Sequence, residues 1–353
     1  MSRLLEQPLN GTTYASSGVS IEAGDAAVER IKDIVASTKR PEVLGGIGGF
    51  GGLFALDTSR YASPVLVASA DGVGTKLDIA RQVGRYDSVG IDLVAMLVDD
   101  LACVGAEPLF LLDYVAVGKL EPARLEELVT GIAEGCRRAN TALLGGETAE
   151  HAGVMAPDDL DVAGFAVGVV ERGEELGPER VRDGDALVGF ASPGLRSNGY
   201  SLARRVLVND VGDLSAPAWD GAEHSLGDEL LVPSVIYAPT ITALRRELGG
   251  ALHGCAHITG GGIVGNVARI LTSELDALID MESFETPEIF FEIQRRGRVH
   301  ADEMVRVFNC GLGMVVALEV SSADAAISIA RANGVEATKV GSVKSGTGEV
   351  VLS

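Results

Sequence analysis

The sequence predicts an α/β protein with two domains, and three observations support this fold class. Short apolar runs, such as residues 65–68 and 186–190, alternate with segments whose apolar residues recur at helical spacing. Several of these runs end in glycine-rich turns that precede a helix. Residues 171–185 (ERGEELGPERVRDGD) are charged and rich in turn formers, as is typical of a domain boundary. We therefore expect one domain over residues 1–172 and a second over residues 173–353.

Composition excludes several classes of protein. With 353 residues, of which 46% are hydrophobic and 22% charged, the chain is long and apolar enough for two folded cores. Its net charge of −21 argues against nucleic acid or an anionic membrane as a partner. Residues 1–19 form a polar lead-in that is unlike a signal peptide, and no apolar run reaches bilayer length. The four cysteines are widely spaced, which favours free thiols and a cytoplasmic location.

The first helix is expected after Ser20, a residue type that caps helix N-termini. Its apolar face follows a spacing of three and four and consists of Val28, Ile31, Ile34 and Val35. Lys32 lies beside this face, so the residue pattern alone indicates a solvated surface lysine.

A glycine-rich segment follows at residues 45–52 (GGIGGFGG), in which six of eight residues are glycine. Such a segment lets backbone amides approach an anionic ligand closely. It is not a P-loop, because no Gly-Lys-Ser/Thr sequence ends it. A flexible hairpin would have the same composition, so both interpretations stay open at this point.

The stretch from residue 64 to residue 108 organises the first domain. Residues 65–68 predict a buried strand in a sheet covered on both faces. A turn follows that carries a carboxylate, a hydroxyl and an ammonium group, from Asp71, Thr75 and Lys76. Residues 91–104 then predict a helix that is apolar on nearly all sides and stops at Gly105.

Two adjacent carboxylates, Asp99 and Asp100, interrupt this apolar helix. A buried charge is paired, protonated or bound to a metal, because burying it alone is too costly. One interpretation is an ion pair with a distant Arg or Lys. The other is that Asp100 and Asp71 converge on a divalent cation that carries nucleotide phosphates, as Mg²⁺ does with one or two carboxylates.

The remainder of the first domain repeats the strand and helix alternation. We expect a strand over residues 110–117, a helix that begins at Pro122 and ends at Asn140, and a strand over residues 162–170. Between them, strand 142–144 leads into a glycine turn that carries Glu147. Since ligands bind beyond the carboxyl ends of strands in open α/β sheets, we expect Asp71 and Glu147 to face one crevice.

The second domain places two polar turns after strands. Strand 186–190 leads into Arg196, Ser197, Asn198 and Gly199, a turn suited either to an anion or to an ordinary helix cap. The second turn, Thr259, Gly260 and Gly261, follows His257, which as a lone histidine is more often a core residue. The other predicted elements are strands at 275–280 and 313–318, helices at 288–294 and 323–333, and a terminal hairpin at 340–352.

Together these residues resemble the phosphoribosylformylglycinamidine cyclo-ligase family, also called the AIR synthetases. The resemblance spans almost the whole chain, and its motifs are YASSGVSIEAG, RPEVLGGIGGFGG, DGVGTK, GIDLVAM, GAEPLF, LDYVAVGKL, GGETAE, DVAGF, SNGYSL, AHITGGG and FNCGLGM. Residues 100–108 also fit the D-x4-G-A-x-P signature of the wider superfamily of ATP-using synthetases. That signature alone indicates only the superfamily, whereas the full set is specific to the cyclo-ligases.

The resemblance implies a fold, a reaction and partners. It implies a homodimer of two-domain α/β chains in which amino-terminal-domain strands of both subunits form a barrel at the interface. It implies the ATP-dependent cyclisation of formylglycinamidine ribonucleotide to 5-aminoimidazole ribonucleotide, with release of ADP and phosphate, in purine biosynthesis. ATP and Mg²⁺ are the implied cofactors.

The resemblance also implies roles for individual residues. Asp71, Asp100 and Glu147 correspond to the metal and phosphate carboxylates, and Asp71, Asp100 and His257 to the catalytic groups. ATP binding would fall to Gly46, Gly48, Gly49 and Gly51 of the glycine segment, with Thr75, Lys76 and Lys32. Substrate binding would fall to Arg196, Ser197, Asn198, Gly199, Thr259, Gly260 and Gly261.

Two positions depart from the family pattern. Asp99 stands where asparagine is frequent, which would add negative charge near the metal. Arg196 stands where histidine is common, which would strengthen anion binding. The alternative within the superfamily is a small-molecule kinase or a selenophosphate synthetase-like enzyme, but the latter needs a reactive cysteine near the N-terminus and the first cysteine here is Cys103. A non-catalytic nucleotide-binding regulator would predict loss of the acidic residues or glycine loops, and the sequence retains both.

Overall fold

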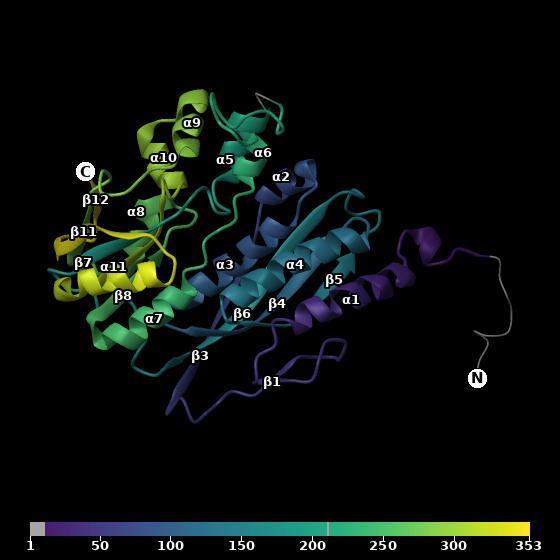
Figure 1. Ribbon diagram of the computed structural model, residues 1–353, viewed down its shortest axis with the longest axis horizontal. Helices are drawn as coiled ribbons and strands as arrows, with labels where there is room; N and C mark the ends of the chain where they lie inside the picture. Colours follow the sequence, from purple (N-terminus) through teal and green to yellow (C-terminus); the bar gives the residue numbers. More distant parts are fainter. Residues whose placement is uncertain (1–10, 210–211) are drawn as a thin grey trace.

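The computed structural model describes residues 11–209 and 212–353, so the predicted lead-in over residues 1–19 lies partly outside the described residues. The chain forms two α/β layers, each with its own sheet, joined along a shared helical layer (Figure 1). The first sheet ends at Glu171 and the second begins at Ala186, so the expected domain boundary at 172/173 falls in the connection between them.

The first domain contains a four-stranded sheet in the order β3-β6-β4-β5. Strands β3 and β4 run antiparallel to β6, whereas β4 and β5 are parallel. The strands are β3 (Pro64–Gly72), β4 (Glu107–Val117), β5 (Ala142–Glu150) and β6 (Leu160–Glu171). The predicted glycine turn after residue 144 is therefore wrong, because β5 continues through Gly145 and Gly146 to Glu150 in register with β4.

Helices cover one face of this sheet, as Figure 1 shows. They are α3 (Asp87–Cys103), α4 (Pro122–Arg138) and, packed outside α4, α1 (Ile21–Ala36). The predicted start of α1 and end of α3 are confirmed. The Ser20 hydroxyl accepts a hydrogen bond from the Ala23 N–H at 3.1 Å, and Gly105 follows α3 with a φ of 82°. Helix α3 is buried over almost its whole length, as its composition predicts.

Among the described residues, the other face of the sheet is largely exposed, although the ring of Phe110 on β4 lies 5.3 Å from that of Phe54. Exposure alternates along β3, where Leu66 is 63% exposed, and the side chain of Phe165 on β6 is 50% exposed. The predicted burial of residues 65–68 on both faces is therefore wrong, because β3 is an edge strand with helices on one side only. None of the three sheets of the described residues closes into a barrel.

The second domain contains a six-stranded sheet in the order β12-β9-β11-β7-β10-β8. Its strands are β7 (Ala186–Ala191), β8 (Leu252–His257), β9 (Leu275–Ile279), β10 (Leu312–Leu318), β11 (Ala337–Ser345) and β12 (Val350–Leu352). The predicted terminal hairpin is wrong, because β9 lies between the two last strands and pairs antiparallel with β11 but parallel with β12. The last strand, β12, thus forms one edge of the sheet by pairing with β9, which lies much earlier in the sequence.

Helices of the second domain surround its sheet and reach the first domain. The described helices are α5 (Tyr200–Arg204), α6 (Leu226–Leu230), α7 (Ala238–Leu248), α8 (Gly262–Val267), α9 (Glu288–Gly297), α10 (Ala301–Val307) and α11 (Ala323–Ala332). Helix α7 packs on α3, so α3 contributes to both cores. The sequence pattern does not predict α6, α7, α10 or the helix α2 (Lys76–Val83), most of which are short.

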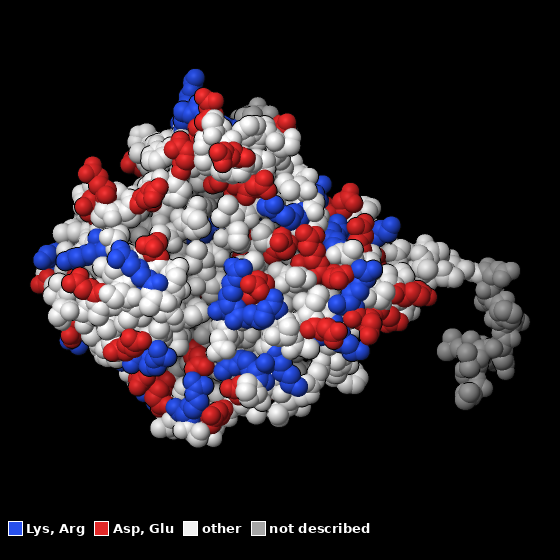
Figure 2. Space-filling model, in the orientation of Figure 1, with Lys and Arg blue, Asp and Glu red and all other residues white. Residues whose placement is uncertain are grey.

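The surface is mixed in charge despite the acidic composition. On the face shown in Figure 2, acidic and basic side chains alternate and form no continuous basic area. Among the described residues, no helix is both long and apolar enough to cross a bilayer. All four cysteines are free thiols.

Candidate active site

Two predicted site carboxylates and one predicted histidine meet where α3 faces the end of β3. Asp71 stands near the end of β3, and Asp100 stands in the last turn of α3 with 45% of its side chain exposed. The Asp100 Oδ1 atom lies 2.9 Å from Nδ1 of His257, which ends β8 of the second domain. The structure therefore brings Asp71, Asp100 and His257 together across the domain junction, although they are up to 186 positions apart in the sequence.

The electrostatics of this cluster favour a cation. Burial, followed by the nearby Asp100 charge, raises the pKa of the Asp71 carboxyl above its usual value. The Gly72 N–H, which donates to Asp71 at 2.7 Å, opposes this shift. A cation between two such carboxylates would relieve their repulsion, and carboxylate oxygens are the ligands that Mg²⁺ prefers.

Asp99 has a structural role, and this corrects the expectation that it adds charge near a metal. Its Oδ2 atom accepts a hydrogen bond from Nη2 of Arg196 at 2.9 Å, and its Oδ1 atom accepts the N–H groups of Tyr237 and Ala238 at 2.7 and 2.9 Å. The side chains of Asp99 and Arg196 are 0% and 1% exposed. The two interpretations of these acids therefore apply to different residues. Asp99 forms an ion pair, whereas Asp100 faces the site.

Lys76 is also structural, which does not fit its expected place beside ATP phosphates. Its ammonium group lies 2.5 Å from Oδ2 of Asp92 and donates to the carbonyls of Arg196 and Val232 at 2.9 and 2.8 Å. Both side chains of the Lys76–Asp92 pair are 0% exposed. The ammonium group is thus enclosed by two carbonyl acceptors and its ion-pair partner Asp92, so it is not exposed to a phosphate in this arrangement.

The two predicted substrate-binding turns lie against each other. A Cβ atom built on Gly260 would stand 3.6 Å from Oδ1 of Asn198. Two buried atoms of the first turn, Ser197 Oγ and Asn198 Nδ2, have no hydrogen-bond partner within the described residues. Since buried polar atoms are normally paired, two such unpaired atoms in a turn that contacts a glycine turn indicate a ligand position.

Residues that the sequence analysis did not single out hold these turns in shape. The Asn266 side chain is buried and donates to the carbonyls of Thr259, Gly260 and Gly262 at 3.2, 3.3 and 2.8 Å. Asn309 likewise donates to the carbonyl of Gly194 at 2.9 Å, at the start of the other turn. Their only signal in the sequence is that Asn309 lies within the motif FNCGLGM and that Asn266 lies four positions after the motif AHITGGG.

Gly199 is required by both conformation and space. Its φ is 75°, and a Cβ atom there would stand 2.2 Å from the ring of Phe308. Thr75, at the N-terminus of α2, reaches the same region, with its hydroxyl 3.4 Å from that of Ser201. Arg196 is brought to this region too, but its guanidinium is buried against Asp99, which does not favour the expected contact with a substrate phosphate.

The glycine segment forms the tip of a hairpin between β1 (Val43–Leu44) and β2 (Leu53–Phe54). Phe50 at this tip is fully exposed, and Cβ atoms on Gly46, Gly48 and Gly51 would meet nothing within 4 Å. A cavity of about 190 Å³ lies beside the hairpin, and its lining includes Lys32, Lys39, Gly45 and Gly46. The structure thus brings Lys32, itself exposed and paired with Glu29 at 3.0 Å, to the base of the glycine segment.

Glu147 does not join Asp71 in one crevice, contrary to expectation. Sheet register places Asp71, Gly164, Asp113 and Gly146 in one row across the four strands. Asp71 and Glu147 therefore lie on opposite edges, three strand spacings or about 14 Å apart. Glu147 follows Gly146, so it points to the opposite face from this row. Among the described residues, no three His, Cys, Asp or Glu side chains are placed to hold one metal ion.

The predicted site residues thus form two groups on opposite edges of the first sheet. The junction group comprises Asp71, Thr75, Asp100, His257 and the turns 197–199 and 259–261. The hairpin group comprises Lys32, the glycine segment and Glu147, since Gly52 packs against Leu144 of β5. Edge strand β3 carries Asp71 of the first group, and edge strand β5 carries Glu147 of the second.

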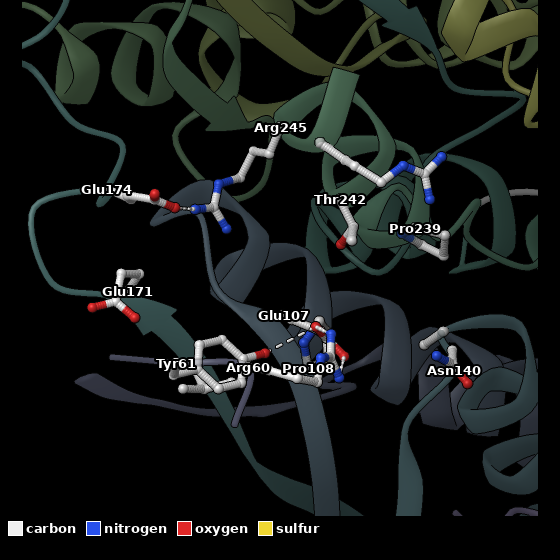
Figure 3. Close-up of a pocket in the computed structure, with 13 residues that line it drawn as sticks. Arg60, Tyr61, Glu107, Pro108, Asn140, Glu171, Glu174, Pro239, Thr242 and Arg245 are labelled. Atoms are coloured by element: carbon white, nitrogen blue, oxygen red, sulfur yellow. Dashed lines mark hydrogen bonds and ion pairs between the residues drawn. The ribbon is translucent and has the colours of Figure 1, made fainter. Parts of the chain in front are cut away.

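A larger cavity, of about 630 Å³, lies at the start of β4, away from both groups (Figure 3). Its charges are largely paired internally, because Arg60 and the Tyr61 hydroxyl contact Glu107 at 2.6 and 3.0 Å and Arg245 contacts Glu174 at 3.1 Å. It contains none of the predicted site residues. We therefore assign no reaction to it.

Comparison with known proteins places the chain in a family. Family models match residues 58–170, described as the N-terminal domain of AIR synthase related protein, and residues 182–353, described as its C-terminal domain. A protein of Myxococcus xanthus (strain DK1622) is 51% identical over 96% of this chain and 98% of its own, and is named phosphoribosylformylglycinamidine cyclo-ligase. The chain belongs to the phosphoribosylformylglycinamidine cyclo-ligase family. The family resemblance found in the sequence is thereby confirmed.

Solved structures share the fold of this cyclo-ligase family member at low identity. The thiamine-monophosphate kinase of Stenotrophomonas maltophilia K279a has a TM-score of 0.68 at 20% identity, over 93% of this chain and 95% of the other. The hydrogenase maturation protein HypE in complex with ATP has a TM-score of 0.64 at 18% identity, over 92% and 90% of the two chains. At these identities the likeness shows the fold alone.

Proposed function

We propose that the chain catalyses the ATP-dependent cyclisation of formylglycinamidine ribonucleotide to 5-aminoimidazole ribonucleotide in purine biosynthesis. Family membership supports the reaction, and the structural observation that carries it is the junction group. There, two carboxylates stand beside two polar turns, and in the first turn the buried Ser197 Oγ and Asn198 Nδ2 atoms lack a hydrogen-bond partner among the described residues. A phosphorylated ribose supplies acceptors for such donors, and a metal nucleotide suits the carboxylates.

The residues present fit Mg²⁺ bound to ATP. Asp71 and Asp100 are the carboxylates that would hold the ion, and nucleotide phosphates and water would supply its other ligands. Bound there, the ion would neutralise charge on the transferring phosphoryl group. The observation that supports this fit is that the Asp100 charge acts on Asp71 and that, among the described residues, neither carboxylate forms an ion pair with a Lys or Arg.

The chemistry requires positioning and charge neutralisation more than a protein nucleophile. ATP phosphorylates the formyl oxygen, which is otherwise a poor leaving group. The neighbouring amine then attacks the formyl carbon and loses a proton, and phosphate leaves as the ring closes. The chain's task is to hold the ribose phosphate at the turns 197–199 and 259–261 so that both reacting groups stay aligned and water is excluded.

The direct test is to incubate the purified protein with ATP, Mg²⁺ and formylglycinamidine ribonucleotide and to assay for the aminoimidazole product. We expect one ADP and one phosphate for each ring closed. ATP hydrolysis without ring closure, or phosphorylation of thiamine monophosphate in its place, would refute the proposed reaction.

Four free thiols agree with a reducing compartment, so we propose the cytoplasm as the location of the protein.

We further propose that two copies of this chain pair through the largely exposed face of the first sheet. This face carries Leu66, Phe165 and the partly exposed Val167, an apolar surface that remains accessible among the described residues. A second copy would cover it, and four strands from each chain could then form the expected barrel. Within one chain the junction group and the hairpin group lie on opposite edges of the sheet. Pairing would allow the junction group of one chain to meet the hairpin group of the other.

Phe165→Asp should convert a dimer into monomers, because it places a charge at the centre of the apolar face. Sedimentation velocity measures the state directly. Val154→Asp is a matched control, since Val154 is 83% exposed and lies outside the sheet. A Phe165→Asp protein that sediments like the parent chain would place the interface elsewhere.

Subunit complementation tests whether a site is shared. Asp100→Asn impairs the junction group and Glu147→Gln the hairpin group. If each site uses one group from each chain, a mixed dimer retains one intact site, so random pairing of two inactive variants restores about a quarter of the parental activity. No recovery in verified mixed dimers would show that each site lies within one chain.

The glycine segment should act through its backbone when nucleotide binds. Gly48 has a φ of 98°, so Gly48→Ala strains the hairpin tip although space around it is open. We expect MgATP to protect the bond after Phe50 from chymotrypsin in the parent protein and to protect it less in Gly48→Ala. Gly24→Ala in α1, where φ is ordinary and space is open, is the control. Equal cleavage of the parent with and without MgATP would mean that the hairpin does not close over nucleotide.

A further inference from the structure

Arg196 links both domains through a chain of hydrogen bonds that ends at Asp100. Its Nη2 atom lies 2.9 Å from Oδ2 of Asp99 and 2.8 Å from Nε2 of His257, and its Nη1 atom donates to the carbonyl of Val235 at 2.8 Å. The other ring nitrogen of His257 lies 2.9 Å from Oδ1 of Asp100. Arg196 has a φ of 61°, an uncommon conformation for a residue with a side chain. The fold thus maintains a strained backbone where this guanidinium enters the junction.

The direction of each hydrogen bond follows from the chemistry of the groups. A guanidinium has only N–H donors, so Nε2 of His257 must accept. A histidine that accepts at Nε2 is neutral and carries its single proton on Nδ1. The Nδ1–H group therefore donates to Oδ1 of Asp100. The contact with Arg196 selects one of the two possible histidine tautomers.

We propose that Arg196 and His257 are positioning residues that fix the orientation of Asp100. Arg196 sets the tautomer and ring orientation of His257, and His257 holds one carboxylate oxygen of Asp100. The second oxygen is left for a ligand on the exposed side. The role of Asp100 toward a metal nucleotide rests on the proposed function, whereas the tautomer of His257 does not.

This assignment differs from the two roles expected from the sequence. His257 is 5% exposed and both of its ring nitrogens have partners, so it touches Asp100 and not a bound substrate. Arg196 is 2% exposed and its charge is matched by Asp99, so a phosphate would have to displace a buried ion pair to reach it. Both residues act through Asp100.

Nitrogen NMR of the protein labelled with ¹⁵N-histidine tests the tautomer without nucleotide or metal. The chain has five histidines, so the ring signals can be assigned by single substitution. Two-bond correlations distinguish a protonated Nδ1 from a protonated Nε2. We expect His257 to show only the Nδ1–H form at neutral pH, and to gain the Nε2–H form in Arg196→Met. An Nε2–H or doubly protonated ring in the parent protein would overturn the proposal, whatever the enzyme assay shows.

Kinetics then test the consequence for Asp100. Arg196→Met should lower kcat by roughly tenfold to a hundredfold, as small misplacements of reacting groups do, and raise the Mg²⁺ concentration needed for half-maximal rate. The KM for the ribonucleotide should stay unchanged, because Arg196 does not reach the substrate. Arg296→Met is the control for loss of a largely buried arginine elsewhere, since Arg296 pairs with Glu292 in α9. A raised ribonucleotide KM at unchanged kcat would assign Arg196 to substrate binding and refute the positioning role.

Discussion

Asp100→Asn should lower turnover by about a hundredfold or more, because removing one charge partner of a transition state commonly costs that much. The fold should be retained, since the side chain is 45% exposed and Asn preserves its shape. Steady-state kinetics at saturating MgATP measure the loss, and thermal unfolding checks the fold. Ring closure and ATP consumption should fall together.

Asp87→Asn is the matched control, since Asp87 begins the same helix α3 and its side chain is 53% exposed. We expect this variant to retain parental turnover. If Asp100→Asn turned over as fast as Asp87→Asn with MgATP, the assignment of Asp100 to the metal nucleotide would be wrong.

Lys76→Met should reduce the free energy of unfolding by about 3–5 kcal/mol, the usual cost of leaving one partner of a buried ion pair alone. The stranded group is Asp92, which keeps two hydrogen bonds to Ser234, from its N–H at 2.8 Å and its hydroxyl at 2.6 Å, but loses its counter-charge. Urea unfolding measures the change. The second substitution in Lys76→Met/Asp92→Asn should restore part of the lost stability, because it removes the unpaired charge.

The same variant separates the structural role of Lys76 from the phosphate-binding role that the sequence pattern implies. The structural role predicts that the folded Lys76→Met protein still binds ATP with parental affinity in a calorimetric titration. If Lys76→Met had parental stability but a large loss of ATP affinity, Lys76 would be assigned to phosphate binding. Its burial would then have to change when nucleotide binds.

Local sequence signals were sufficient for much of the architecture. Ser20 begins α1 and Gly105 follows the end of α3, because a cap hydroxyl and a left-handed glycine act on the nearest few residues. The buried helix α3 follows from its own composition. The short or weakly patterned helices, such as α6 and α10, gave no comparable signal.

The candidate site was predicted in part. Its residue types and the association of Asp71 with Asp100 follow from the cost of burying acids and from the family motifs. The sequence could not show that Glu147 lies on the other edge and face of the sheet. Strand order decides the edge, and a shift of one residue along β5 decides the face.

The sequence by itself determined the fold class, the family and the positions of the main helices, because these depend on spacing within short windows. Only the tertiary structure decided which charges meet. Asp99 pairs with Arg196 across 97 positions, and Lys76 meets Asp92 in the same interior. A buried charge is stabilised by whichever partner the fold brings within hydrogen-bond distance, and no local pattern encodes that partner. For this reason the two acids of α3, adjacent in the sequence, serve different purposes: Asp99 joins the domains and Asp100 faces the site.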